Sequence, residues 1–469
     1  MTSRSEKNIQ KFDTPIISIF LALMIVGWLS IYASEYTPDK PTSILDYSTS
    51  SGRQFIFLIT SALVSFSMLF FNNKFYRTFS VGFYGLSLFL LLLVLVLGQN
   101  VHGDAAWINL GLFKLQPSEF AKPATALFLA SFMDDAKLDL TKFINQAKVF
   151  AIVAIPMVLI LFQGDVGSML VFLSFLIVFY RAGAPSIYYV IGIITIMLSI
   201  LALIYPVLSV ISMAMMVAAL FCAFNLDNNF IWYIVLGFNS ILIMVLNYLG
   251  HELLSIGIST PLLIGLLIVL RKRKLQLAAA LTIAVIGAII YVFSVSYIFY
   301  KVLEPHQQCR VMVWLKPDSK SVNCDDHNIK ESKRAIASGG ALGKGFLEGE
   351  GAQMDRVPEQ STDFIFCTVG EEHGFIGTLA VIFFYGLLLY RILHIAERQR
   401  SDFNRYYAYG AAGIIFTHVF INIGMTIGLM PIIGIPLPFL SHGGSSLIGF
   451  TILLTILIRL DYDRIISRS

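Results

Sequence analysis

Charged residues are scarce in this chain, and their scarcity is the first feature that limits what the protein can be. They make up 13% of the 469 residues, whereas hydrophobic residues make up 57%. Soluble domains carry about a quarter charged residues, so the composition excludes a soluble multidomain protein and indicates a polytopic membrane protein. The net charge of +4 is small for so long a chain and gives no indication of nucleic-acid binding.

Cysteines are also few, which excludes a disulfide-rich scaffold. Cys222 lies in an apolar run and is expected to be a buried hydrophobic residue, and Cys367 has no obvious partner. Cys309 and Cys324 flank a short piece of polar sequence and could form a disulfide if that piece faces an oxidising compartment. A secretory cleavage site is missing as well, so we expect the first apolar run to stay as a membrane anchor.

Long apolar runs dominate what is present. A helix needs about 17–25 mainly apolar residues to cross a bilayer, and such runs recur along the whole sequence. They predict an all-α polytopic fold of about fourteen transmembrane helices, with both termini on one side. The expected helices are 15–34, 54–72, 78–98, 119–133, 148–163, 166–181, 186–204, 207–224, 230–249, 256–270, 276–300, 373–393, 408–430 and 438–460.

The positions of the cations predict the orientation of these helices. Connections on the cytoplasmic side of a membrane protein carry an excess of Lys and Arg. With the N-terminus inside, every strong basic cluster falls on the inner side, and both termini are expected to be cytoplasmic. These clusters contain Lys74, Arg77, Lys137, Lys142, Arg181, Arg271 to Lys274, Arg391, Arg398, Arg400, Arg459, Arg464 and Arg468.

One long polar segment stands apart from the apolar runs and is expected to hold the chemistry. Residues 301–372 contain 21 of the 62 charged residues, 9 basic and 12 acidic, and the orientation places them outside the membrane. Gly343 and Gly345 flank Lys344, so we expect their backbone amides to be available to an anion such as a phosphate. The spacing is not that of a nucleotide-binding loop.

Ionisable residues at the membrane edge are functional candidates because their burial is unfavourable. Pro117 suits a helix start, and Glu119 and Lys122 are spaced to pair on one helix face. The alternative is that this pair only neutralises itself at a helix end. Asp165 follows a Gln-Gly pair between two apolar runs, where it is either a solvated turn residue or a helix cap.

Two further segments near the C-terminal third could line a site. Asp363 precedes three apolar residues, and Glu371 with Glu372 is expected to open a helix, where the dipole favours anions. A solvated acidic face is the alternative. The segment 434–446 is rich in proline and glycine, which is tolerated within a membrane only where backbone lines a cavity or packs in protein; a simple kink is the alternative.

Five segments together, 116–122, 163–167, 331–345, 358–377 and 434–446, resemble the SEDS family (RodA, FtsW and SpoVE), and the elongation branch more than the division branch. The resemblance implies a peptidoglycan glycosyltransferase of the bacterial inner membrane that polymerises lipid II during elongation and cell-shape maintenance. It also implies a class B penicillin-binding transpeptidase and other elongation-complex membrane proteins as partners. The alternatives are a flippase for lipid-linked precursors and an inactive scaffold for the transpeptidase.

Residue by residue, the resemblance and the residue types above give one set of substrate-binding candidates. Among them, Lys122, Arg310 and Lys344 could stabilise the departing pyrophosphate, and a divalent cation such as Mg²⁺ or Mn²⁺ could assist. The full set is Glu119, Lys122, Asp165, Arg310, Lys344, Glu359, Thr362, Asp363, Glu371, Glu372, Ser441 and Ser445.

The catalytic aspartate is where the sequence departs from the family pattern. The resemblance implies an Asp-Pro segment about ten residues before Glu331, but counting back reaches Lys320. The acids near that point are Asp318 and Asp325, followed by Asp326, and the sequence does not choose between the first two. One of them would act as the general base on the 4-hydroxyl group of the acceptor sugar.

The family has ten spans, so the segment 185–300, with five apolar runs where the family needs one, contains an insertion of four helices. We therefore expect four parts. Residues 1–184 are N-terminal family helices, 185–300 a family helix with the insertion, 301–372 the extracytoplasmic catalytic loop, and 373–469 the C-terminal family helices.

Overall fold

The computed structural model describes residues 12–38, 43–101, 104–109, 111, 114–135, 138–226, 230–315, 327–350 and 359–466. The chain forms two compact units. Unit 1 combines Met1–Pro185 with Asp325–Ser469, and unit 2 is Ser186–Cys324. Both ends of the sequence therefore contribute to one helical bundle, and the segment between them forms the other.

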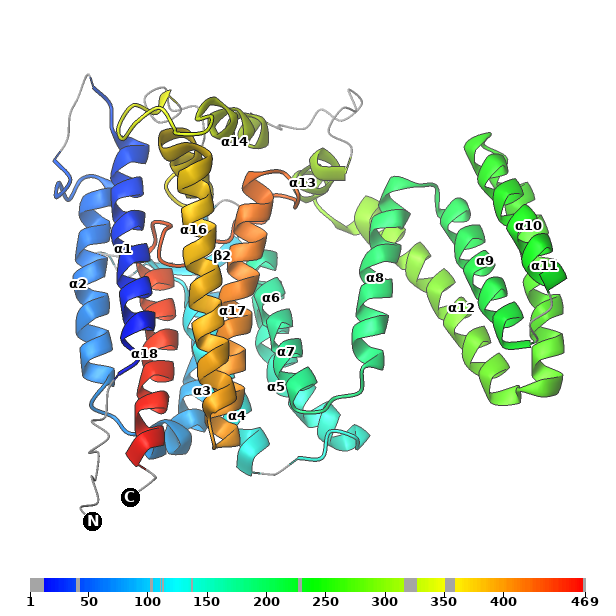
Figure 1. Cartoon of the computed structure of the whole chain (residues 1–469), viewed down its shortest axis with the longest axis horizontal. Helices are drawn as coiled ribbons and strands as arrows, with labels where there is room; N and C mark the ends of the chain where they lie inside the picture. The colour runs from blue at the N-terminus through cyan, green and yellow to red at the C-terminus, as the bar shows by residue number, and fades with distance from the viewer. Residues whose placement is uncertain are drawn as a thin grey trace, which may run out of the picture. The chain divides into compact units, whose positions relative to one another are not determined.

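Unit 1 is a bundle of long, roughly parallel or antiparallel helices (Figure 1). Its central helices are α17 and α18, which are buried over most of their length, and Tyr407 of α17 donates a hydrogen bond of 3.0 Å to the carbonyl oxygen of Leu453 in α18. The helices are α1 (Thr14–Glu35), α2 (Ser50–Met68), α3 (Asn73–Leu97), α4 (Pro117–Asp135), α5 (Phe143–Phe162), α6 (Val166–Val171), a 3₁₀ turn (Phe172–Phe175), α7 (Leu176–Arg181), α14 (His327–Ser338), α16 (Ile365–Arg398), α17 (Asp402–Thr426) and α18 (Gly444–Ile466).

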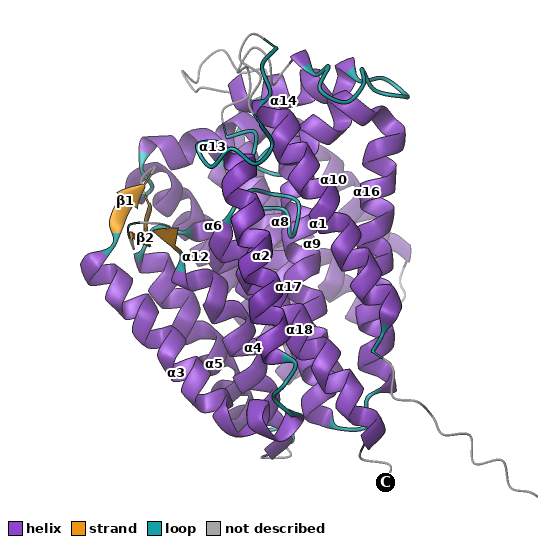
Figure 2. Cartoon of the chain, turned by 90° about the vertical axis from the view of Figure 1, so that its left-hand side faces the viewer, coloured by secondary structure: helices purple, strands orange, loops and turns teal. Residues whose placement is uncertain are grey.

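A small antiparallel sheet lies between α3 and α4 and is the exception to the predicted all-α class (Figure 2). Its strands are β1 (Gln99–Val101), β2 (Asp104–Asn109) and β3 (Lys114–Leu115), in that order. Ile108 pairs with Leu115, so the chain returns to the bundle directly before α4. The sheet therefore leads the chain into the helix that carries Glu119 and Lys122.

Unit 2 consists of six helices. They are α8 (Ile187–Ile204), α9 (Val207–Leu226), α10 (Phe230–Tyr248), α11 (Glu252–Arg273), α12 (Leu275–Tyr297), which continues as a π-helical turn (Ile298–Val302), and α13 (Pro305–Leu315). Of these, α8, α10, α11 and α12 pack against α9. Cys222 is fully buried in the core of this unit with Leu266 and Leu270, which confirms the prediction for this cysteine.

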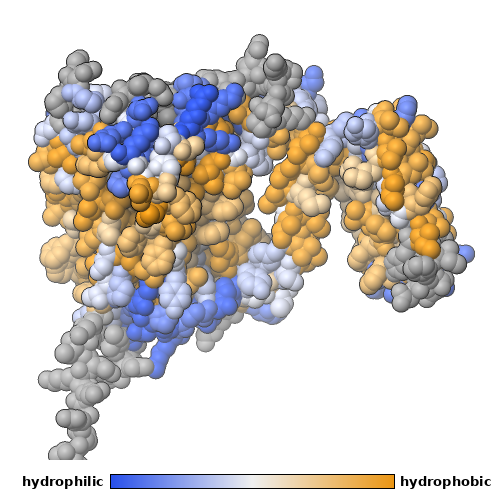
Figure 3. Space-filling model, turned by 45° about the horizontal axis from the view of Figure 1, so that its top comes forward, coloured by the Kyte–Doolittle hydropathy of each residue, from blue (hydrophilic) through white to orange (hydrophobic). Residues whose placement is uncertain are grey.

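The helices identify a multi-pass membrane protein. Ten described helices are long and apolar enough to cross a bilayer: α1, α3, α5, α8, α9, α11, α12 with its π turn, α16, α17 and α18. Figure 3 shows a hydrophobic band on unit 1 between hydrophilic ends. Each of the fourteen predicted runs lies mainly on helical residues, but the count of fourteen spans is not confirmed, because α4, for example, contains four charged residues.

Two interruptions between helices lie where the sequence predicts them. Residues 163–165 form a tight turn in which Gly164 has φ +87°, and α6 begins directly after it. Between α17 and α18 the chain is irregular from Ile427 to Gly443, so α18 starts at Gly444 and not at 438. The simple-kink alternative is therefore wrong. We call residues 427–443 the irregular segment.

Candidate functional site

Glu119 and Lys122 form a buried ion pair on the first turns of α4. The Lys122 Nζ atom lies 2.6 Å from Oε1 of Glu119, and the two residues are 1% and 2% exposed. The predicted pairing on one helix face is confirmed. The other Glu119 oxygen, Oε2, is buried and has no hydrogen-bond partner among the described residues, so the pair is not fully satisfied within the described structure.

His418 of α17 completes this cluster. Its Nε2 atom lies 2.9 Å from Lys122 Nζ, and its Nδ1 atom lies 3.0 Å from the carbonyl oxygen of Pro436 in the irregular segment. A carbonyl oxygen only accepts hydrogen bonds, so Nδ1 carries the hydrogen and Nε2 accepts from the ammonium group. The ring of Phe450 in α18 lies 5.7 Å from Lys122 Nζ, a cation–π distance.

Sequence reasoning missed His418. The signal that could have found it is an ionisable residue inside an apolar membrane helix, because residues 410–421 contain no other charged or ionisable side chain. Together, Glu119, Lys122 and His418 join α4, α17 and the irregular segment, and we call these three residues the buried triad.

Asp165 is a helix cap and not a solvated turn residue. Its Oδ1 atom accepts a hydrogen bond of 2.8 Å from the backbone amide of Ser168, which caps α6, and its Oδ2 atom accepts one of 3.0 Å from Gln116 Nε2. Asp165 is only 7% exposed. Because Gln116 directly precedes α4, these contacts fix the start of the helix that carries the buried triad.

Ser445 and Ser441 hold backbone at the same end of the bundle. The Ser445 hydroxyl accepts a hydrogen bond from the Gln116 amide and donates one to the carbonyl oxygen of Lys114, both at 3.1 Å. The Ser441 hydroxyl accepts from the amide of Leu437 at 2.8 Å, within the irregular segment. In this structure both serines support local backbone.

The end of the polar loop meets the irregular segment through Asn422 of α17. The Asn422 side-chain amide donates to the carbonyl oxygens of Asp363, at 2.9 Å, and Ile435, at 2.7 Å. Asp363 is half-buried, and a Cβ atom on Gly434 would lie 3.3 Å from its Oδ2 atom. The structure therefore brings Asp363 next to the predicted segment 434–446. The residue that links them by hydrogen bonds is Asn422, which sequence reasoning missed.

Glu359 and Thr362 lie in the turn that precedes Asp363. Glu359 is exposed and has φ +54°, and the Thr362 hydroxyl donates to Glu359 Oε2 at 3.1 Å. The amide of His442 donates to the carbonyl oxygen of Ser361 at 2.9 Å. This turn therefore lies beside the irregular segment, with Glu359 facing solvent.

Glu371 and Glu372 do not open a helix, so that prediction is wrong. α16 begins at Ile365, and both residues lie in the last turn before a break at Gly374, where φ is +63° and ψ is −158°. A Cβ atom on Gly374 would lie 2.3 Å from the backbone nitrogen of Gly343. The close approach of this glycine-rich turn creates the break, and the two carboxylates therefore stand near a helix C-terminus, where the dipole disfavours anions.

Lys344 offsets that unfavourable position. Its Nζ atom lies 2.8 Å from Glu371 Oε1, where Glu371 is 3% and Lys344 23% exposed in their side chains. Burial lowers the pKa of Lys344, but the hydrogen bond and the charge of Glu371 outweigh it, so the pKa is raised above 10.5. The amide of Leu347 donates to Glu372 Oε1 at 3.1 Å.

The amides around Lys344 are not available to an anion as predicted. The amide of Lys344 donates to the carbonyl oxygen of Glu371 and that of Gly345 to the carbonyl oxygen of Glu372, both at 3.0 Å. The turn therefore serves to bind the end of the first part of α16. Its side-chain cation remains partly accessible.

Several predicted residues are not part of this arrangement. Asp318, Asp325, Asp326 and Cys324 lie outside the described residues, so the catalytic acid and the disulfide stay predictions. Arg310 is exposed on α13 in unit 2, beside Cys309. Within the described ranges no three His, Cys, Asp or Glu side chains are grouped to hold a metal ion, so Mg²⁺ or Mn²⁺ also stays a prediction.

Known sequences and structures match nearly the whole chain. The sequence model of the FtsW/RodA/SpoVE family, cell cycle proteins, matches residues 13–224 and 208–465. The peptidoglycan glycosyltransferase RodA of Treponema pallidum is 30% identical over 445 residues, which are 94% of this chain and 95% of that protein. The peptidoglycan glycosyltransferase MrdB of Escherichia coli K12 is 40% identical over 175 residues, 36% of this chain and 47% of MrdB.

The fold has solved counterparts. A chain of a peptidoglycan synthase complex that coordinates polymerization and crosslinking matches with a TM-score of 0.63 and 22% identity, over 97% of this chain and 98% of that chain. At this identity the match establishes the fold. None of the residue roles described above falls on the four helices that the sequence predicts as an insertion.

Proposed function

We propose, from the fact that this chain belongs to the FtsW/RodA/SpoVE family of cell cycle proteins, that it is a peptidoglycan glycosyltransferase acting in cell elongation. The observation that carries the proposal is the 30% identity with the Treponema RodA over 94% of the chain. The substrate is lipid II, and the product is a glycan strand. The membrane location supports it, because a lipid-linked substrate is reached from the bilayer.

Glycosyl transfer needs a base for the acceptor and charge stabilisation for the leaving group. The base removes the proton of the acceptor 4-hydroxyl group as its oxygen attacks the anomeric carbon of the donor, and the bond to lipid pyrophosphate breaks. Asp318, Asp325 and Asp326 are the candidates for this base. The pyrophosphate carries negative charge, which a nearby Lys or Arg side chain stabilises.

The described cations differ in how accessible they are to the pyrophosphate of the substrate. Lys122 is fully buried and engaged by Glu119 and His418, so we assign it a positioning role. Lys344 has 23% of its side chain exposed and lies in the polar loop, so it is the described cation of unit 1 that we assign to the pyrophosphate. Arg310, on unit 2, is exposed and is a second candidate.

The buried triad acts on the site through the irregular segment. His418 holds Pro436, and Asn422 holds the neighbouring Ile435 together with Asp363. A shift in the triad therefore moves the backbone that carries Asp363, the half-buried carboxylate at the end of the loop. We assign Asp363 to substrate binding and the triad to its positioning.

The test is polymerisation of labelled lipid II by the purified full chain, followed on a gel. We expect glycan polymer from the wild type and none from the variant with alanine at Asp318, Asp325 and Asp326. Asp139→Ala, in a different loop, is the matched control and should retain polymer. Unchanged polymer from the triple variant would refute the base assignment, whereas translocation of lipid II without polymer would support a flippase.

We also propose a class B penicillin-binding transpeptidase as partner and the bacterial inner membrane as location, with both termini in the cytoplasm. The match to a chain of a complex that coordinates polymerization with crosslinking supports the partner. The placement of the basic clusters supports the orientation. Alkaline phosphatase fused after Gly349 should be active and after Lys274 inactive; the reverse pattern would overturn the orientation.

A further inference from the structure

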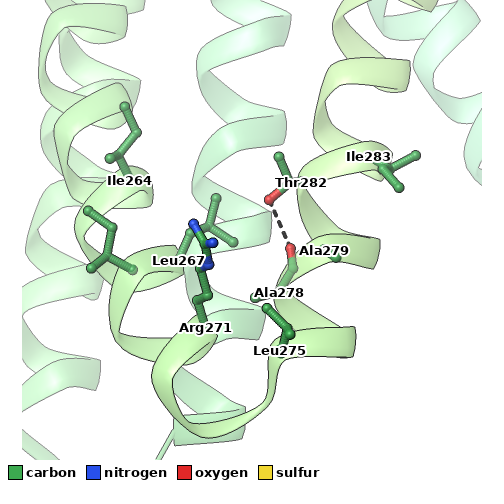
Figure 4. A pocket seen from close by; sticks show the side chains of 9 residues that line it. Ile264, Leu267, Arg271, Leu275, Ala278, Ala279, Thr282 and Ile283 are labelled. Atoms are coloured by element: carbon green, nitrogen blue, oxygen red, sulfur yellow. Dashed lines mark hydrogen bonds between the residues drawn. The ribbon is translucent and has the colours of Figure 1, made fainter.

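We propose that unit 2 binds an anionic phospholipid of the inner leaflet in a groove between α11 and α12. The groove has a volume of about 470 Å³, which is within the range of small-molecule sites, roughly 300–1,000 Å³. It lies near the turn between the two helices (Figure 4). We call it the α11–α12 groove; it is lined by Ile264, Leu267, Ile268, Arg271, Leu275, Ala278, Ala279, Thr282 and Ile283.

The walls of the groove suit an acyl chain. Seven of its nine lining residues are aliphatic, and the small side chains of Ala278 and Ala279 leave the space on the α12 side. The hydroxyl group of Thr282 already donates a hydrogen bond of 2.8 Å to the carbonyl oxygen of Ala278 (Figure 4). The walls therefore offer an apolar ligand extensive contact and leave Arg271 as the group to recognise a charge.

Arg271 is the residue that the packing of unit 2 does not explain. Its side chain extends between α11 and α12 (Figure 4), as expected for a helical residue, whose side chain tilts toward the N-terminus. It makes no hydrogen bond or ion pair with the described residues. Arg273, two residues later, instead donates to the carbonyl oxygen of Leu226 at 3.0 Å. Arg271 is exposed, so its guanidinium group at the mouth of the apolar groove is accessible to a ligand of opposite charge.

A phosphate group satisfies Arg271 better than any neutral ligand. The guanidinium fork binds phosphate oxygens through two parallel hydrogen bonds. Lys272 and Lys274 add positive charge next to the groove, and the sequence has no acidic residue between Glu252 and Glu304. Cytoplasmic orientation explains why four cations occur here. The orientation does not explain why Arg271 points between two helices at an apolar groove (Figure 4). A bound lipid explains it, because its phosphate would meet Arg271 while its acyl chain fills the groove.

Binding of defined lipids to the purified full chain tests this proposal. The chain in detergent is titrated with palmitoyl-oleoyl phosphatidylglycerol or with the matching phosphatidylcholine, and bound lipid is counted by native mass spectrometry. We expect phosphatidylglycerol to bind at least about tenfold more tightly, because a hydrogen bond to a charged group is worth that factor or more. Equal binding of the two lipids would overturn the proposal.

Three variants separate the groove from a general surface charge. Arg271→Ala should lose the preference, and Ala279→Phe, which fills the groove without changing the charge, should weaken binding by a similar factor. Lys272→Ala removes a cation that does not line the groove and should change binding by less than about twofold. Equal loss in Arg271→Ala and Lys272→Ala would indicate diffuse charge and refute the groove.

A last arm distinguishes the lipid from a free anion. Inorganic phosphate at millimolar concentration should leave phosphatidylglycerol bound, because it cannot replace the contacts of the acyl chain with the groove. Displacement of the lipid would show a simple anion site and overturn the proposal. Thermal unfolding of each variant shows whether it is folded, and if Arg271→Ala unfolds, Ala279→Phe still decides the outcome.

Discussion

The Nζ atom of Lys122 lies 2.9 Å from Nε2 of His418, although 296 residues separate the two. The same ammonium group pairs with Glu119 three residues earlier. One buried cation therefore connects the start of α4 to the middle of α17. His418 in turn donates a hydrogen bond to the carbonyl oxygen of Pro436 in the irregular segment. The arrangement is balanced in charge, because one carboxylate faces one ammonium group and a neutral ring.

Removing one member of the ion pair should be far more harmful than removing both. Lys122→Met leaves the Glu119 carboxylate buried without its cation, and loss of one partner of a buried pair costs about 3–5 kcal/mol. The double variant Glu119→Gln with Lys122→Met should recover most of this stability. Thermal unfolding in detergent measures the difference; a double variant as unstable as Lys122→Met would contradict a pairwise role.

Asn422→Leu should disconnect the loop end from the irregular segment. The variant removes both hydrogen bonds that the buried Asn422 side chain donates, to the carbonyl oxygens of Asp363 and Ile435, so we expect a loss of about 1–3 kcal/mol and a marked fall in lipid II polymerisation. The matched control is Asn239→Leu, because the side-chain amide of Asn239 donates its hydrogen bond within its own helix, to the carbonyl oxygen of Val235. Equal polymerisation by the two variants would exclude the positioning role of Asn422.

Gly374→Ala tests the break in α16. Position 374 has φ +63°, and an added Cβ atom would lie 2.3 Å from the backbone of Gly343, so we expect destabilisation by more than about 1 kcal/mol. Gly386 lies in the same helix with no atom within 4 Å of an added Cβ, and Gly386→Ala should stabilise by about 0.5–1 kcal/mol. Unfolding midpoints compare the two; a neutral Gly374→Ala would rule out the close approach.

The pH dependence of stability should include a contribution from Asp13. Burial raises the pKa of Asp13, but hydrogen bonds from Arg391 and Arg398, at 2.6 and 2.8 Å, outweigh it and lower the pKa below 3.8. A carboxyl group with a lowered folded pKa stabilises the fold above its unfolded pKa and loses this effect as the pH falls through the folded value.

Asp13→Asn should therefore be less stable than the wild type at pH 7, by about 1.5–3 kcal/mol for bonds to a charged group. The difference should shrink as the pH falls below about 3.9, the unfolded pKa of Asp. Unfolding midpoints of both proteins between pH 3 and 7 measure it. Asp402→Asn, at an exposed residue of α17, is the control, and a constant gap between wild type and Asp13→Asn would contradict the prediction.

Local features were predictable from the sequence because their causes are local. Long apolar runs must form helices in a bilayer, since each backbone group needs a partner within the segment, and every predicted run is mainly helical. The Glu119–Lys122 pair follows from helical spacing. The turn at Gly164 and the irregular segment were also predictable, because a high density of proline and glycine disfavours a continuous helix.

Only the tertiary structure decided the rest, because it depends on which helices pack together. No local pattern pairs Lys122 with His418, or sets Asn422 between Asp363 and Ile435. The run 365–398 is nearly continuous in sequence, and only the approach of Gly343 breaks it at Gly374. That contact reversed the expected position of Glu371 and Glu372 on their helix, since helix ends are set by the partners that the backbone finds in three dimensions.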